Sequence, residues 1–165
     1  VKNIPAKTIA EAEKLCGAFD GEKLSSCHQE SWPLYRDQIL TPKGLEKFCS
    51  YTSDEEMQRR CYNALFYVIP VQVNFDQAKL IAFCEGMSVK KRAQCFANFA
   101  SRFIETDYQF ADASVGFCKA AERLGVQDEC YKELAFYATF NYRPGSPESA
   151  HLCQSLPEQY QAQCQ

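Results

Sequence analysis

The sequence of 165 residues predicts an all-α protein, a right-handed α-solenoid of about five helix-turn-helix repeats that are each stapled by one disulfide. One observation behind this prediction is the spacing of ten cysteines, which alternate between short separations of 11 or 12 residues and long separations of 22 or 23. The resulting period of 33–35 residues is typical of stacked repeat proteins. The other observation is that apolar positions and helix-capping residues follow the same period.

The residues around the cysteines repeat with them. The residue before the first cysteine of each pair is apolar in all five repeats: Leu15, Phe48, Phe83, Phe117 and Leu152. The residue after the second cysteine is aromatic or an imidazole in four repeats: His28, Tyr62, Phe96 and Tyr131. Four residues after that cysteine, Leu65, Phe99 and Leu134 agree, whereas Ser31 departs. Side-chain burial is therefore expected to follow the period.

We expect one repeat domain over residues 1–165, with approximate repeats 5–38, 39–73, 74–107, 108–142 and 143–165. The third repeat shows the pattern most clearly. Asp76 is expected to cap a first helix over residues 77–84, because its side-chain oxygen can accept hydrogen bonds from the free amides of the first turn. Gly86 and Ser88 mark the end of this helix and the cap of a second helix over residues 89–104.

Other repeats carry comparable signals. Thr41-Pro42 and Ser146-Pro147 are caps followed by proline at the first helical position, where a missing amide hydrogen costs nothing. Ser53, followed by three acidic residues, is expected to open the second helix of the second repeat. Gly125 separates the two helices of the fourth repeat.

The two terminal repeats are less regular. Pro33 predicts that the second helix of the first repeat is kinked or restarts after Trp32. In the fifth repeat, the polar residues that follow Glu158 either form a truncated capping helix or belong to an array that continues beyond Gln165. The sequence leaves both alternatives open. Residues 68–73 are β-prone, but Pro70 interrupts them, so no strand is predicted.

The helical hairpins also predict how the cysteines pair. In each repeat both cysteines lie near the closed end of the hairpin, where helix axes 8–10 Å apart let a disulfide join them. The predicted pairs are Cys16–Cys27, Cys49–Cys61, Cys84–Cys95, Cys118–Cys130 and Cys153–Cys164. Disulfides persist in oxidising surroundings, so we expect a secreted, periplasmic or cell-surface protein.

A period near 34 with two helices per repeat resembles the tetratricopeptide-like repeats, and one cysteine on each helix is similar to their secreted, cysteine-rich Sel1-like branch. The resemblance covers nearly the whole chain through period and cysteine placement. It implies a helical solenoid and a binding role. No functional motif of the family matches, so the resemblance assigns no site residue.

Composition and motifs argue against several other functions. A net charge of -3 leaves no basic surface for nucleic acid, and no apolar run approaches the roughly 20 residues that span a membrane. The close cysteine pairs of zinc sites, the haem attachment motif, the G-x-S-x-G nucleophile motif and a glycine-rich phosphate loop are all missing. His28 and His151 are expected to be packing or surface residues. We therefore predict no cofactor, no metal and no catalysis.

Tyrosine and tryptophan supply the functional candidates, because both are enriched at binding hot spots. Seven lie outside a shared repeat position and are the candidate interface: Trp32, Tyr35, Tyr51, Tyr67, Tyr108, Tyr137 and Tyr142. The preferred hypothesis is a non-catalytic protein-binding or scaffold module, part of a larger surface or secreted assembly and capable of self-assembly. The alternatives are a secreted enzyme domain with acidic groove residues, and a carbohydrate-binding module that uses exposed Trp32 and Tyr35 as stacking platforms.

Overall fold

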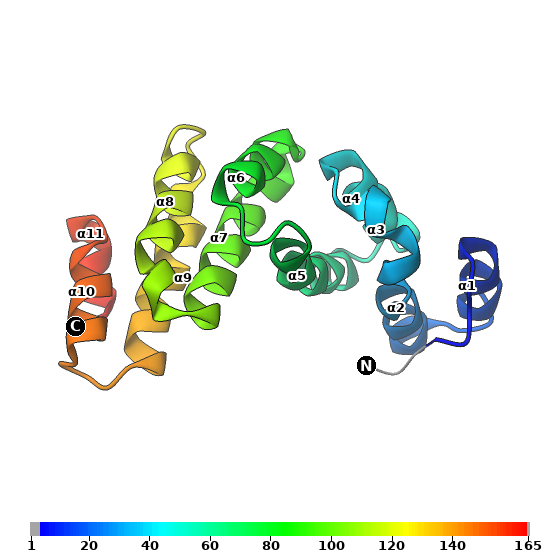
Figure 1. The fold of residues 1–165 in the computed structure, drawn as a ribbon, viewed down its shortest axis with the longest axis horizontal. Coiled ribbons are helices and arrows are strands. Elements are labelled where there is room, and N and C mark those ends of the chain that lie inside the picture. The colour runs from blue at the N-terminus through cyan, green and yellow to red at the C-terminus, as the bar shows by residue number, and fades with distance from the viewer. Residues whose placement is uncertain (1–3, 165) are drawn as a thin grey trace. The chain divides into compact units, whose positions relative to one another are not determined.

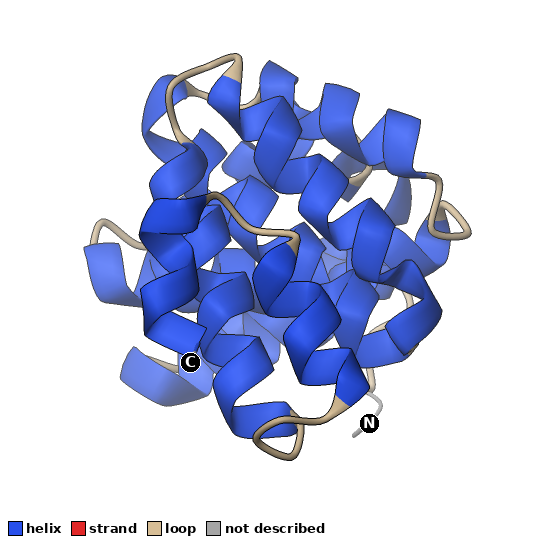
Figure 2. Ribbon diagram, turned by 90° about the vertical axis from the view of Figure 1, so that its left-hand side faces the viewer, coloured by secondary structure: helices blue, strands red, loops and turns tan. Residues whose placement is uncertain are grey.

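The computed structural model describes residues 4–164. Throughout this range the regular structure is helical and no strand occurs (Figure 2), which confirms the all-α prediction. The α-helices of the described range are α1 (Ile9–Cys16), α2 (Gly21–Glu30), α3 (Arg36–Ile39), α4 (Pro42–Phe48), α5 (Glu55–Gln72), α6 (Gln77–Gly86), α7 (Val89–Thr106), α8 (Ala111–Glu122), α9 (Gln127–Asn141), α10 (Pro147–Gln154) and α11 (Glu158–Gln161). Short 3₁₀ turns are η1 (Trp32–Tyr35), η2 (Cys49–Tyr51), η3 (Tyr108–Phe110) and η4 (Ala162–Cys164).

Five disulfides close the successive hairpins, with the pairing that the cysteine spacing predicts. They are Cys16–Cys27, Cys49–Cys61, Cys84–Cys95, Cys118–Cys130 and Cys153–Cys164. Their Cα–Cα distances lie between 5.3 and 6.0 Å, within the range that a disulfide requires. The first four bridges each join two consecutive helical elements, whereas Cys153–Cys164 joins α10 to η4, with α11 between them. Five intrachain disulfides fit an oxidising compartment outside the cytoplasm.

Three of the predicted side-chain caps form, whereas Ser88 precedes α7 without a capping hydrogen bond. The side chains of Thr41, Asp76 and Ser146 accept hydrogen bonds from the amides of the first turns of α4, α6 and α10. The prediction for α5 needs a correction, because Asp54 is the cap rather than Ser53. The Oδ1 atom of Asp54 accepts from the Met57 amide at 2.8 Å, and its negative charge also suits the positive end of the helix.

Contacts divide the chain between Ile69 and Pro70 into two compact units, and helix α5 crosses this boundary. In the N-terminal unit α1 packs on α2, and α3 packs on α4. Helix α2 ends at Glu30 and the chain restarts through η1 and α3, as Pro33 predicts. The core of this unit includes Ile39 and Leu45, which are fully buried.

In the C-terminal unit, helix α7 packs against α6, α8 and α9, and α9 packs in turn against α8, α10 and η4. Helices α8 and α9 lie side by side (Figure 1). Phenylalanine rings fill the space between α6, α7 and α8: Phe83 contacts Phe99, and Phe117 contacts both Phe99 and Phe103 at centroid distances of 4.9–6.0 Å. Phe83, Phe99 and Phe117 occupy repeat positions at which the sequence predicts burial.

Burial follows the repeat position even where the residue type changes. Four residues before the first cysteine of each pair, the side chain is buried in all five hairpins: Ala12, Leu45, Leu80, Ser114 and Ser149. The two serines replace apolar residues without leaving an unpaired hydroxyl. Ser114 donates to the carbonyl of Ala100 at 2.8 Å, and Ser149 donates to that of Ala138 at 3.1 Å. Each bond ties the first helix of one hairpin to the second helix of the preceding hairpin.

Candidate functional site

Three of the predicted interface tyrosines converge in the C-terminal unit. Tyr108 lies in η3, Tyr137 on α9, and Tyr142 directly after α9. The Tyr142 ring centroid lies 5.7 Å from that of Tyr108 and 5.7 Å from that of Tyr137, with interplanar angles of 84° and 72°. All three side chains are half-buried. We call Tyr108, Tyr137 and Tyr142 the tyrosine cluster.

Two local features of the backbone place these rings together. Asp107 accepts a hydrogen bond from the Gln109 amide at 2.8 Å, which starts η3 and sets the position of Tyr108. After α9 the chain turns through Gly145, whose φ of 77° favours glycine, before Ser146 caps α10. This turn brings the first residues of α10 back towards Tyr142.

Two carboxylates interact electrostatically with tyrosines of the cluster. Asp112 lies in the first turn of α8 and Glu148 in the first turn of α10. Burial raises the pKa of Tyr108, and the negative charges of Glu148 and Asp112 raise it further. The pKa of Tyr142 is raised to about 12, first by burial and then by the two neighbouring tyrosines and Glu148. These hydroxyls therefore stay protonated at neutral pH and can both donate and accept hydrogen bonds.

One imidazole borders the cluster. The His151 ring lies 6.3 Å from Tyr108 in an edge-to-face arrangement, and its Nε2 atom lies 3.4 Å from Oδ1 of Asp112. Both side chains are largely exposed, so this contact contributes little to stability. His151 is a surface residue, as the sequence analysis expects.

Sequence reasoning missed a second apolar feature on α9. Phe136 and Phe140 are 57% and 69% exposed, and their rings contact each other at 4.4 Å. Helix α5 shows comparable exposure six and ten residues after Cys61, where Tyr67 and Val71 are 54% and 46% exposed. Phe136 and Phe140 occupy the same positions after Cys130.

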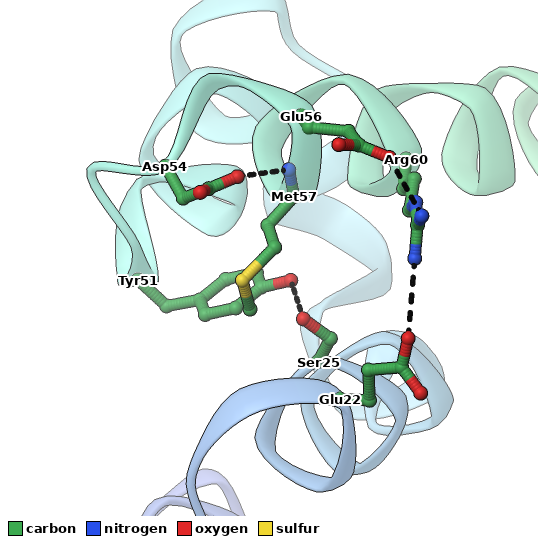
Figure 3. Close-up of polar contacts among 7 residues, drawn as sticks. All are labelled: Glu22, Ser25, Tyr51, Asp54, Glu56, Met57 and Arg60. Carbon is green, nitrogen blue, oxygen red and sulfur yellow. Dashed lines mark hydrogen bonds and ion pairs between the residues drawn. The ribbon is translucent and has the colours of Figure 1, made fainter.

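The remaining predicted interface residues lie in the N-terminal unit or on α5. Tyr35 is only 8% exposed and packs edge-on against Phe48 at 5.0 Å, so its prediction as an exposed stacking platform is wrong. Trp32 is half-buried in η1, and Tyr67 is exposed. Tyr51 is half-buried, and its hydroxyl donates to Ser25 Oγ at 2.9 Å (Figure 3).

These N-terminal contacts are structural. In Figure 3 Arg60 reaches both Glu56 and Glu22. The Arg60 contacts measure 2.6 and 3.6 Å, but all three side chains are mostly exposed. Exposed ion pairs of this kind orient helices more than they stabilise them. The Tyr51 hydroxyl joins η2 to α2.

Each terminal hairpin contains a pocket. A pocket of about 300 Å³ lies in the C-terminal unit, lined by uncharged residues that include Thr139, Pro144 and the Cys153–Cys164 disulfide. A more open pocket of about 590 Å³ lies beside α1 and α2, where Phe19, Lys23 and Glu30 contribute to its wall.

Two glutamates lie near one serine in the C-terminal unit. The Ser101 hydroxyl lies 3.5 Å from Glu105 and 3.4 Å from Glu133, which brings two carboxylates to one side of α7 and α9. Within residues 4–164, no group of three or more histidine, cysteine, aspartate or glutamate side chains is placed to hold a metal ion. Among the same residues, no helix has both the length and the apolar character needed to cross a membrane.

No protein-family model matches this chain, and no curated protein or solved structure shows significant similarity to it. The comparisons therefore give no support to a tetratricopeptide-like or Sel1-like assignment. The structure shows an all-α chain whose hairpins are closed by disulfides.

Proposed function

We propose that this chain is a non-catalytic protein-binding or scaffold module that works outside the cytoplasm, in the medium, the periplasm or at the cell surface. The proposal is based on the exposed side chains of α9 and of the segments next to it. There Tyr137 of the tyrosine cluster precedes Phe140, a large and highly exposed apolar side chain, by three residues on α9. Aromatic residues of this kind dominate the energetics of protein interfaces.

The proposed architecture is an α-solenoid of four complete hairpins and a partial fifth. Packing of α8 on α6 and α7, and of α10 on α9, supports this arrangement within the C-terminal unit. The recurrent burial four residues before each first cysteine supports it along the chain. The resemblance to tetratricopeptide-like repeats enters only through the period and the helical hairpins. Solenoids of this kind commonly present an extended surface to another protein.

Two exposed phenylalanines on one helix increase the risk of aggregation in a secreted protein, so we expect them to have a functional role. Phe136 and Phe140 contact each other, and this mutual contact covers only part of their surface. A partner that covers the remainder would gain about 1.5–3 kcal/mol for each fully buried phenylalanine. The partner is either a different protein or a second copy of this chain.

Site-specific photocrosslinking tests the proposal. A benzophenone side chain replaces Phe140, and the same group replaces Val89, an exposed apolar residue at the start of α7, as the matched control. We expect one protein to be captured repeatedly from position 140 and not from position 89. Capture of the chain itself would identify self-assembly as the scaffold role. Absence of any adduct at position 140, or equal capture at both positions, would contradict the proposal.

A further inference from the structure

The tyrosine cluster combines aromatic rings with carboxylates that have no fixed cationic partner. We propose that this site binds a lysine or arginine side chain of the partner protein, through cation–π contact with the tyrosines and ion pairing with Glu148 and Asp112. The inference rests on the proposed function and names the chemistry of the partner segment that this site recognises.

Ring geometry supports a cation as the ligand. Tyr142 stands almost perpendicular to both Tyr108 and Tyr137, so adjacent rings bound a corner instead of covering each other face to face. An ammonium or guanidinium group in such a corner can approach the π-surface of more than one ring. Such contacts contribute most where the cation is partly removed from water. The half-buried positions of the three tyrosines meet this condition.

Local charge supports the same ligand. In the described part of the chain Glu148 has no ion pair or hydrogen bond, and Asp112 contacts only His151, which carries a charge only when protonated. Arg143 follows Tyr142 in sequence but makes no ion pair with either carboxylate. The protein therefore leaves negative charge beside the aromatic rings without neutralising it. Complementary charge from a partner would both steer association and fix the register of binding.

The rings and the carboxylates come from different helical elements. The rings come from η3, α9 and the residue after α9, whereas the carboxylates come from the first turns of α8 and α10. Acidic residues at a helix start are already favoured by the helix dipole, so the carboxylates alone would suggest nothing. What distinguishes this site from the acidic start of α5, where Tyr51 bonds to Ser25, is that these carboxylates act on two of three converging tyrosines, Tyr108 and Tyr142.

A titration by nuclear magnetic resonance tests the inference on the full chain with isotope-labelled tyrosine rings. The probes are three capped tripeptides, Gly-Lys-Gly, Gly-Arg-Gly and neutral Gly-Gln-Gly. We expect saturable shifts of the cluster tyrosines with the two basic peptides, with a dissociation constant on the order of millimolar, and none with Gly-Gln-Gly. Equal shifts with all three peptides, or none with any, would overturn the inference. Equal shifts would instead indicate a site for neutral polar ligands such as sugars.

Substitutions test the contributions of the tyrosine rings and of the carboxylates separately. Tyr142→Leu should weaken binding of Gly-Arg-Gly by about threefold to thirtyfold, and Glu148→Gln by about twofold to fivefold. Tyr67→Leu and Glu158→Gln are the matched controls, because they change an exposed tyrosine and a first-turn carboxylate away from the cluster. Circular dichroism verifies that each variant is folded. Binding that survives Tyr142→Leu in a folded variant would refute the site.

Failure of this inference is distinguishable from failure of the proposed function. If position 140 captures a partner while the basic and neutral peptides behave alike, the binding module stands and the cation site does not. If the basic peptides bind selectively while position 140 captures nothing, the cation site stands and the proposed role of α9 fails.

Discussion

The imidazole of His28 stacks on the ring of Phe48 at a centroid distance of 4.3 Å, and its Nε2 atom lies 2.6 Å from the carbonyl oxygen of the same Phe48. Tyr51 lies 4.4 Å from the imidazole as well. The contact joins the first disulfide hairpin to α4 and η2. Burial lowers the pKa of His28, although its hydrogen bond to Phe48 and the charge of Glu13 partly oppose the shift.

This lowered pKa predicts that His28 makes stability depend on pH. The unfolded chain takes up a proton at His28 near pH 6.5, whereas the folded chain resists protonation until a lower pH. The contribution is therefore present above pH 6.5 and is lost as the pH falls through the folded pKa. Urea unfolding at pH 7.5 and pH 5.0 should show a smaller loss for His28→Phe than for the natural protein. An equal loss in the natural protein and in His28→Phe would contradict the prediction.

Gly44 is predicted to tolerate no side chain. A Cβ atom at this position would lie 1.9 Å from the carbonyl oxygen of Gln38 and 2.7 Å from Thr41 Oγ1, the atom that caps α4. Gly44→Ala should therefore lower the free energy of unfolding by about 2–4 kcal/mol, through overpacking and loss of the cap. Urea titration measures the change. Lys43→Ala, at the exposed neighbouring position, should change it by less than about 0.5 kcal/mol.

The hairpins and their disulfide pairing could be predicted because both depend on short-range spacing. Eleven or twelve residues fix where two cysteines meet across one turn, whatever the surrounding chain does. Ser31 shows that burial at a repeat position does not require an apolar residue. It is buried at a position where other repeats have leucine or phenylalanine, and its hydroxyl donates to the carbonyl of His28. A small polar residue can occupy the core position when its hydrogen bond is local.

Exposure of the aromatic residues could not be predicted in the same way. Tyr35 is buried because the chain restarts through η1 and packs its ring on Phe48, a residue of the next repeat. Helix α9 is apolar on more than one face, so its sequence does not distinguish Phe136 and Phe140 from core residues. The packing of α7, α8 and α10 determines which face of α9 is buried. The tyrosine cluster likewise depends on the turn at Gly145, and the repeat period does not predict this turn.

Accessibility predicts the order in which the disulfides are reduced. The six cysteines of the three central bridges are at most 1% exposed, whereas Cys27 and Cys164 in the terminal bridges are half-buried. A reductant must reach a sulfur atom to attack it, so the terminal bridges should open first under native conditions. Brief treatment with a phosphine, followed by alkylation and peptide mass spectrometry, measures the order. Labelling of Cys84 or Cys118 before Cys27 and Cys164 would show that the central hairpins open more readily than their burial indicates.

The last prediction compares a central disulfide with the apolar core beside it. Replacing Cys84 and Cys95 together by alanine should lower the free energy of unfolding by about 2–4 kcal/mol without abolishing the fold. The helices α6 and α7 should survive, because most helical stability in a protein comes from packing of an apolar face. That face is present in Phe99, which is fully buried and contacts Phe83 and Phe117.

Phe99→Ala should therefore cost about 3–5 kcal/mol, as much as the loss of the bridge or more. Circular dichroism with urea titration ranks the two variants, and Val89→Ala, at an exposed position of the same helix, is the control that should change little. A double cysteine variant that is wholly unfolded, together with a neutral Phe99→Ala, would reverse the ranking. The bridges alone would then define the fold, as in small disulfide-rich proteins, and the proposed solenoid would fail because its neighbouring hairpins would not stabilise one another.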